Sequence, residues 1–265
     1  MNLRDQMSGT IPAPLLHLTP KRFDIIGNIA VISIPPELDD FKDEIAKTIV
    51  SKRGNVRTVL NKVAKLDGEK RVGGFERLLG SDTVTQHREF GFEYRLDLNK
   101  VFFNSRLGFE RKRVTAQVLP SENVIIPFCG VGPFVVPAAA SGAKITAIEK
   151  NTEACKWLAE NVRLNGVGSN VSIINADASE IVNIPYINFD RAIVPTPYGL
   201  DSYLASILPL VKKEGMVHFY TFKVESQIQG LIDEYESMGL ETVFYRRCGN
   251  VAPSVSRWVF DLLKR

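Results

Sequence analysis

The chain has 265 residues, of which 45% are hydrophobic and 24% are charged. This length suits two modest domains, and the composition is that of a folded globular protein rather than a disordered one. No apolar run is long enough to span a bilayer, and the start, MNLRDQMSG, lacks the apolar core of a signal peptide. We therefore expect a cytoplasmic protein with no membrane partner.

Charge and cysteine content narrow the partners further. The net charge is +3, but residues 1–118 carry 20 Lys+Arg against 15 Asp+Glu, while residues 119–265 carry 13 against 15. This basic excess at the front favours a polyanionic partner only modestly. The three cysteines, Cys129, Cys155 and Cys248, form no CxxC pair and the chain has only three histidines, so we predict no metal site. Cys129 lies in a glycine loop without a nearby histidine, and we expect a buried or loop-lining thiol there rather than a nucleophile.

The first 118 residues predict a small basic α+β domain. The pattern gives β segments on both sides of Gly27 and Asn28, a helix after the Pro35-Pro36 break, and two further strands. A basic helix follows the aromatic stretch KVFFNSR and runs to Pro120, where the character of the sequence changes. The expected elements are strands within 23–34, a helix over 37–52, strands at 56–63 and 90–98, and a helix at about 107–117.

From residue 119 to 265 strands alternate with helices, which predicts an α/β domain with a parallel, doubly wound sheet. The last two strands, near 240–247 and 255–263, have no helix between them. We expect them to form an antiparallel hairpin at the sheet edge. That ending is typical of the seven-stranded Rossmann-like methyltransferase fold and disfavours a plain dinucleotide-binding fold.

The loop FCGVGPF carries the first cofactor signal. Gly130 and Gly132 lie where the chain must turn sharply and let a ligand approach the backbone, and Pro133 suits a first helical turn. Glu149 ends the next strand, where a carboxylate can accept both hydroxyls of a ribose, and Asp177 follows the third strand, where methyltransferases place an acid beside the adenine amino group. A ligand-free glycine turn, a surface acid and a helix N-cap are the respective alternatives.

The fourth strand ends in DRAIVPTPYG. Pro195 and Pro197 cannot donate backbone hydrogen bonds, so the chain should leave the sheet there as a stiff loop. Loops at the carboxyl ends of strands hold ligands in open α/β sheets, which makes this loop a candidate substrate site. A proline-rich turn without a role is the alternative.

Three segments together carry a specific resemblance: HREFGFEYRLDLNKVFFNSRLGFER, FCGVGPFVVPAA and AIEKN. From about Phe23 to the end the chain resembles the archaeal and eukaryotic tRNA guanine-N1 methyltransferases that act at position 37, and their wyosine-pathway relatives. The resemblance implies S-adenosyl-L-methionine as cofactor and tRNA as partner, with the anticodon loop of phenylalanine tRNA as the target, and we expect a monomer that does not bind DNA. Only some twenty residues precede Phe23, so we expect the family's small tRNA-elbow domain to be missing.

The resemblance also implies roles for single residues. Arg88 corresponds to an arginine that stabilises negative charge on the base oxygen, and Glu110 to the general base that takes the guanine N1 proton. Phe102 and Arg106 correspond to residues that contact the methyl donor, and Arg111 to one near phosphate. A surface arginine, and an exposed glutamate paired with Arg113 or Lys112, are the alternatives for Arg88 and Glu110. Residues 47–77, with nine Lys+Arg against three Asp+Glu, are predicted to contact RNA phosphates.

Two departures from the family pattern shape the expected reaction. Ile126 stands where an acid usually precedes the glycine loop, and Pro195-Thr196-Pro197 replaces the Asn-Leu-Pro motif that grips guanine. The latter form resembles the archaeal branch that methylates C7 of 4-demethylwyosine, some members of which also methylate guanine N1. Two alternatives stay open: an aminocarboxypropyl transferase, whose branch has Gly-Asn where this chain has Arg106-Leu107, and an inactive tRNA-binding relative.

Overall fold

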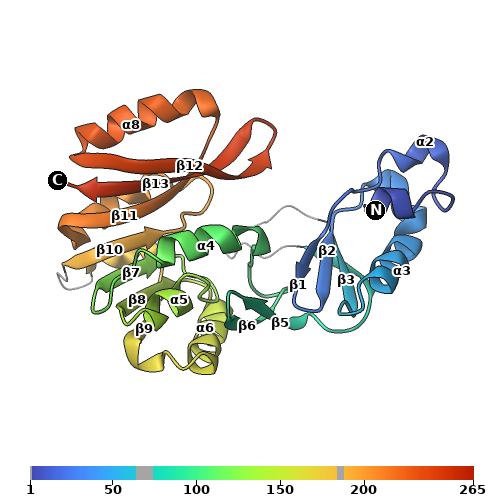
Figure 1. The fold of residues 1–265 in the computed structure, drawn as a ribbon, viewed down its shortest axis with the longest axis horizontal. Helices are drawn as coiled ribbons and strands as arrows, with labels where there is room; N and C mark the ends of the chain where they lie inside the picture. Colours follow the sequence, from blue (N-terminus) through green and yellow to red (C-terminus); the bar gives the residue numbers. More distant parts are fainter. Residues whose placement is uncertain (1, 64–73, 184–187) are drawn as a thin grey trace. The chain divides into compact units, whose positions relative to one another are not determined.

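The computed structural model describes residues 2–63, 74–183 and 188–265. The chain divides into two compact units, Met1–Ser105 and Arg106–Arg265. Figure 1 labels most of their helices and strands. The boundary predicted near residue 118 stays a prediction of where the cofactor-binding domain begins. Across the described residues, no helix is long and apolar enough to cross a membrane.

The first unit holds a four-stranded sheet of order β1-β2-β3-β4 and a separate antiparallel pair, β5-β6. Strands β2 and β3 run parallel. Its elements are α1 (Leu3–Gln6), α2 (Ala13–Leu16), β1 (Asp24–Ile26), β2 (Ile29–Ile32), η1 (Pro36–Phe41), α3 (Lys42–Lys52), β3 (Thr58–Lys62), β4 (Phe75–Leu79), β5 (Val84–Glu89) and β6 (Phe92–Asp97).

The core of this unit forms where α3 packs against the sheet. Ile45 and Ile49 recur at helical spacing on one face of α3 and join Ile32 and Val59 of the strands in a single buried cluster. The turn between β1 and β2 needs a glycine, because Gly27 has a φ of +58° and a Cβ there would lie 2.1 Å from the hydroxyl of Thr85. The two β segments predicted around Gly27 are confirmed; they pair as an antiparallel hairpin, and their turn contacts β5.

The second unit holds a seven-stranded sheet of order β12-β13-β11-β10-β7-β8-β9. Strands β7 to β11 pair in parallel, and β13 runs antiparallel to both β11 and β12. The predicted Rossmann-like fold with its closing hairpin is confirmed. The elements are η2 (Ser105–Leu107), α4 (Gly108–Thr115), β7 (Asn123–Pro127), α5 (Val135–Ala140), β8 (Lys144–Glu149), α6 (Thr152–Leu164), η3 (Gly168–Asn170), β9 (Val171–Asn175), η4 (Ala178–Asn183), β10 (Phe189–Val194), α7 (Tyr203–Ile207), η5 (Leu208–Leu210), β11 (Val211–Lys223), η6 (Glu225–Gln227), α8 (Ile228–Ser237), β12 (Leu240–Ala252) and β13 (Val255–Lys264).

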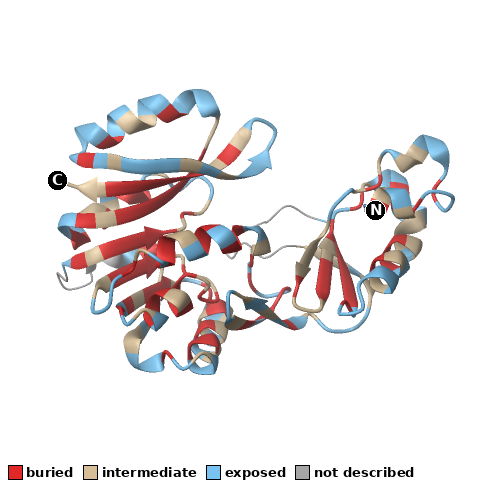
Figure 2. Cartoon of the chain, in the orientation of Figure 1, coloured by how far each residue is buried: buried red, intermediate tan, exposed pale blue. Residues whose placement is uncertain are grey.

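Side chains along β11 point alternately to the two faces of this sheet, one of which is apolar and the other polar. Val217 and Phe219 belong to the apolar core that α7 and α8 cover, where Phe219 meets the ring of Tyr235. His218 and Tyr220 point to the opposite face and make polar contacts there. Figure 2 shows the central strands of this sheet as largely buried. The buried polar residues on the second face therefore hold partners inside the protein rather than water.

Candidate cofactor and catalytic site

The glycine loop after β7 is fixed from behind by α6. Gly132 has a φ of +93°, and a Cβ there would lie 2.4 Å from Cδ1 of Leu158. The side-chain amide of Asn161 donates a 3.0 Å hydrogen bond to the carbonyl of Val131. Gly130 differs, because a Cβ on it would meet no atom of the described residues within 4 Å. One glycine thus lets the loop pack on the helix, and the other leaves the loop open on its free side.

Glu149, at the carboxyl end of β8, ties this loop to the next one. Its Oε2 accepts a 2.8 Å hydrogen bond from the Gly130 N–H, and its Oε1 accepts one of 2.8 Å from the Asn151 N–H. Burial raises the pKa of Glu149 above its ordinary value, and these backbone donors partly offset the shift. A carboxylate oxygen can accept more than one hydrogen bond, so Glu149 can also accept ribose hydroxyls beside the open face of Gly130. The residues present fit a nucleoside cofactor at this edge.

Two further features of the loop match their expected geometry. The helix assignment begins at Val135, yet the Val136 N–H already donates to the carbonyl of Gly132, so Pro133 occupies the first hydrogen-bonded turn.

Cys129 is buried, and burial raises the pKa of its thiol well above the ordinary value. The predicted buried thiol is confirmed. Ile126, in place of the family's acid, lies fully buried in β7.

Asp177 follows β9 and begins η4. It accepts hydrogen bonds from the backbone N–H and hydroxyl of Ser179 and pairs with Lys150 at 2.9 Å. The ammonium of Lys150 and the donors of Ser179 lower the pKa of Asp177 to about 2. The carboxylate caps the turn that follows it, and its side chain, one-third exposed, can still accept from an adenine amino group.

The loop after β10 leaves the sheet as the prolines predict. Pro195 and Pro197 are half-buried, and Thr196 between them is buried with its N–H and hydroxyl both donating to the carbonyl of Val194. Tyr198 beyond them is exposed, and its ring lies 5.3 Å from that of Phe222. Thr196 therefore stiffens the loop from within, and the substrate contact expected of Pro195 and Pro197 stays a prediction.

The remaining residues carried over from the family are distributed over both units. Arg88 lies in β5 with a largely exposed side chain, ion-paired across the hairpin to Glu93. Phe102 is also exposed in the first unit, and Arg106 is an exposed residue of η2. Arg111 of α4 is buried. The catalytic and cofactor roles of these residues stay predictions.

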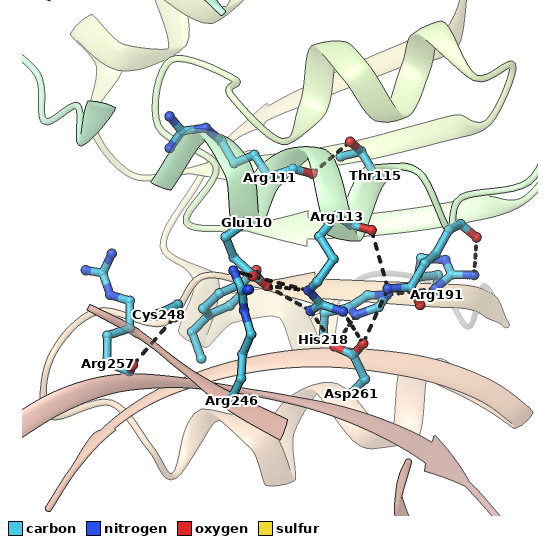
Figure 3. A network of polar contacts seen from close by, with 12 residues as sticks. Glu110, Arg111, Arg113, Thr115, Arg191, His218, Arg246, Cys248, Arg257 and Asp261 are labelled. Atoms are coloured by element: carbon cyan, nitrogen blue, oxygen red, sulfur yellow. Dashed lines mark hydrogen bonds and ion pairs between the residues drawn. The ribbon is translucent and has the colours of Figure 1, made fainter. Parts of the chain in front are cut away.

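Glu110 is buried rather than exposed. Its carboxylate receives Nη2 of Arg113 at 2.8 Å, Nη2 of Arg246 at 2.6 Å and the hydroxyl of Tyr220 at 3.2 Å (Figure 3). The pairing with Arg113 was foreseen as an alternative, but the partners on β11 and β12 were not. The candidate base thus sits between two guanidinium groups.

The contacts of Glu110 continue as a buried polar network. Arg113 bonds both carboxylate oxygens of Asp261, at 2.6 and 3.0 Å, and Asp261 accepts from Nδ1 of His218 at 2.7 Å (Figure 3). Arg191 reaches Nε2 of His218 at 2.7 Å and pairs with Glu122. No motif in the sequence predicted this network. Its signal was a polar residue inside each of three apolar strand runs: FDRAIV, GMVHFY and WVFDLL.

Burial and charge settle the protonation pattern of this network. Burial lowers the pKa of His218. Burial alone would raise the pKa of Asp261, but its contacts with His218 and Arg113 outweigh this effect and hold that pKa well below the usual range. His218 is therefore neutral, donating from Nδ1 to Asp261 and accepting at Nε2 from Arg191. Among the described residues, no group of three or more His, Cys, Asp or Glu side chains could hold a metal ion.

Two family models together match most of the chain. The TRM5/TYW2 methyltransferase domain matches residues 85–239, and the TYW2 N-terminal domain matches residues 3–83. The chain belongs to the TRM5/TYW2 methyltransferase family. The resemblance drawn from the three sequence segments is thereby confirmed.

Curated relatives fall in both branches of the family. Over 221 residues the chain is 37% identical to tRNA (guanine(37)-N(1))-methyltransferase Trm5b of Pyrococcus abyssi, covering 83% of this chain and 66% of that protein. Over 220 residues it is 34% identical to tRNA(Phe) (4-demethylwyosine(37)-C(7)) aminocarboxypropyltransferase of Pyrococcus horikoshii, covering 82% and 77%. The match thus spans just under two thirds of the first relative.

Solved structures agree with this grouping. The complex of aTrm5 with tRNALeu superposes with a TM-score of 0.89 at 26% identity, covering all of this chain and 78% of that one. TYW2 of P. horikoshii in complex with MeSAdo superposes with a TM-score of 0.80 at 30% identity, covering 98% and 97%. The fold prediction is confirmed, and so is S-adenosylmethionine as the cofactor of the family.

Proposed function

We propose that this protein transfers the methyl group of S-adenosyl-L-methionine to the modified purine at position 37 of phenylalanine tRNA, at C7 of 4-demethylwyosine or N1 of guanosine. Membership of the TRM5/TYW2 family supports an S-adenosylmethionine-dependent tRNA enzyme. The observation that carries the proposal is the loop in which Glu149 holds Gly130, with Asp177 just after the next strand, β9.

The chain's own residues provide binding, orientation and charge. When bound, S-adenosylmethionine supplies a methyl group activated by a sulfonium. Glu149 accepts the ribose hydroxyls and Asp177 the adenine amino group, while the loop of Pro195 and Pro197 borders the target base. Holding the base in line with the methyl group and excluding water accounts for most of the catalysis, and Arg88 stabilises charge on the base oxygen.

Arg106 favours methyl transfer over aminocarboxypropyl transfer. The aminocarboxypropyl branch resembles this chain but has Gly-Asn at Arg106-Leu107. A guanidinium at this position can hold a carboxylate or phosphate bidentately, which keeps the methionine chain away from the base and the methyl group toward it. The exposed side of Arg106, on η2 at the start of the second unit, suits that contact.

The aminocarboxypropyl transferase is the second candidate. The match of residues 3–83 to the TYW2 N-terminal domain, and the 34% identity to the P. horikoshii transferase, favour it. Both reactions use the same cofactor, so cofactor binding does not separate them.

Two labelled donors decide between the candidates. S-adenosylmethionine labelled in the methyl group, or in the methionine backbone, is incubated with the protein and phenylalanine tRNA from a strain deleted for this gene. Only methyl label should enter the tRNA, and Arg106→Ala should lower the rate without switching the product. Backbone label in the tRNA would instead establish the aminocarboxypropyl reaction. Nucleoside mass spectrometry of the product then separates C7 from N1 methylation.

A further inference from the structure

The carboxylate of Glu110 has no free position for a proton in this arrangement. Oε1 accepts from Nη2 and Nε of Arg113 and from the hydroxyl of Tyr220, and Oε2 accepts from Nε of Arg113 and Nη2 of Arg246. Two guanidiniums and a hydroxyl therefore occupy the accepting positions of both oxygens. One partner must leave before Glu110 can act as a base.

Two of the three partners are locked in place. Arg113 also holds both oxygens of Asp261 and stacks over the ring of Phe244, 4.6 Å from its centroid. Tyr220 is almost fully buried in β11. Moving either one would break contacts well beyond Glu110.

Arg246 is held less firmly than Arg113 and Tyr220. It lies on β12, the edge strand of the sheet, with a side chain 33% exposed, and its guanidinium lies 5.6 Å from the centre of the exposed ring of Phe109. Its Nε is buried and, among the described residues, has no hydrogen-bond partner. The planar fork of Nε and Nη donors that suits a phosphate is thus only half used by Glu110.

We propose that Arg246 is a releasable partner of Glu110: it pairs with the carboxylate in the free protein and passes to a phosphate of the bound RNA, which frees Oε2 of Glu110. This inference rests on the proposed function, because it takes the substrate to be tRNA. Phosphate satisfies both Nε and Nη of Arg246, and the freed Oε2 can accept the N1 proton of the purine as the methyl group bonds there. Arg246 acts as a positioning residue, and Glu110 becomes a base only beside RNA.

The test measures RNA binding and needs no turnover. An unmodified transcript of phenylalanine tRNA is titrated with the protein from low to physiological salt. Glu110→Gln keeps the shape of the side chain but removes its charge and replaces one accepting oxygen with a donating amide nitrogen, which weakens its hold on Arg246. We expect it to tighten RNA binding roughly three- to fivefold and to steepen the salt dependence by about one unit, the value of one added phosphate contact.

The same substitution in two further backgrounds isolates Arg246. With Arg246→Met the gain from Glu110→Gln should vanish, and with Arg246→Lys it should shrink, since lysine lacks the fork. With Arg247→Met, an exposed arginine next on the strand, the gain should persist in full. S-adenosylmethionine affinity, measured by calorimetry, should be the same in all variants and serves as the check of folding.

The outcomes separate this inference from the proposed function. An equal gain from Glu110→Gln in all backgrounds would show a general charge effect and overturn the role of Arg246, as would no gain in any of them. A wild-type protein that binds S-adenosylmethionine but not the transcript would overturn the proposed function itself.

Discussion

The backbone N–H of Gly130 donates a 2.8 Å hydrogen bond to Oε2 of Glu149, nineteen residues further along the chain. The carboxylate at the end of β8 therefore holds the loop after β7 in the shape that leaves Gly130 open. Glu149→Gln cannot accept from this N–H, from Asn151 and from two ribose hydroxyls at once. We expect S-adenosylmethionine affinity to fall roughly 10- to 100-fold, the value of about one to two charge-assisted hydrogen bonds.

Calorimetric titration measures this loss. Glu160→Gln, which removes the same charge from the later part of α6, serves as the control and should bind S-adenosylmethionine like the wild type. Equal affinity in Glu149→Gln and wild type would remove Glu149 from the cofactor site.

The pH dependence of cofactor binding should follow Glu149 rather than Asp177. Burial raises the pKa of Glu149, whereas Lys150 and Ser179 lower that of Asp177 to about 2, so Glu149 is the first of the two to be protonated as pH falls. S-adenosylmethionine affinity should therefore decline on acidification from neutral pH, beginning above the ordinary glutamate value. In Glu149→Gln this decline should be absent. A decline of the same size in both proteins would assign it to another group.

Alanine at the two loop glycines should have different effects. At Gly132 it should mainly lower stability, and at Gly130 it should mainly weaken cofactor binding. Gly132→Ala places a Cβ 2.4 Å from Leu158 at a φ of +93°, so we expect a loss of about 2–3 kcal/mol in the free energy of unfolding. Gly130→Ala meets no atom, and its φ of +56° is one that alanine tolerates at about 1 kcal/mol. Its methyl group would instead enter the open side of the loop and weaken S-adenosylmethionine binding at least tenfold.

Urea unfolding should show the larger loss of stability in Gly132→Ala. Calorimetry should show the larger loss of S-adenosylmethionine affinity in Gly130→Ala. If Gly130→Ala bound S-adenosylmethionine normally, the open side of the loop would not be where the cofactor lies.

The buried network should control acid stability. Asp261→Asn breaks the pairing with Arg113 and His218 and should cost about 3–5 kcal/mol at neutral pH. Because the folded pKa of Asp261 is depressed, its contribution is complete above the unfolded value of about 4 and is lost as pH falls toward the folded value. The difference between wild type and variant should thus narrow below about pH 4.

Trp157 and Trp258 both lie in the second unit, so their fluorescence reports its unfolding in urea. Asp233→Asn, on the exposed face of α8, should change stability by no more than about 0.5 kcal/mol. A loss in Asp261→Asn that stayed constant down to acidic pH would contradict the assigned pairing.

The basic segment 47–77 should contact RNA phosphates, although its residues 64–73 lie outside those the structure describes. Lys52, Arg53 and Arg57 are exposed at the end of α3 and just after it. Replacing all three by alanine should weaken tRNA binding and lower the salt slope by about two to three units. The control replaces the same charge on exposed lysines of the second unit: Lys144, Lys156 and Lys213. Equal slopes in the two variants would refute the prediction.

Local patterns predicted the glycine loop and Glu149, because a strand, a turn and a helix follow one another there within some twenty residues. The short helices α1 and α2 and the strands β4 and β5 escaped prediction, since four-residue helices and runs such as VTQHRE carry too little apolar periodicity. The surroundings of Glu110 escaped for another reason. Its partners Tyr220 and Arg246 lie more than a hundred residues away, and only the sheet order brings them to α4.

The place of β13 has a consequence for biosynthesis. This strand follows β12 in the chain but lies between β11 and β12 in the sheet. Until the ribosome has made β13, β12 lacks the strand with which it pairs, and Arg113 lacks its partner Asp261. The nascent domain can assemble β7 to β11 early, but the edge that carries Arg246 must wait for β13. Pulse-labelled nascent chains should therefore stay sensitive to protease in β12 until β13 has emerged.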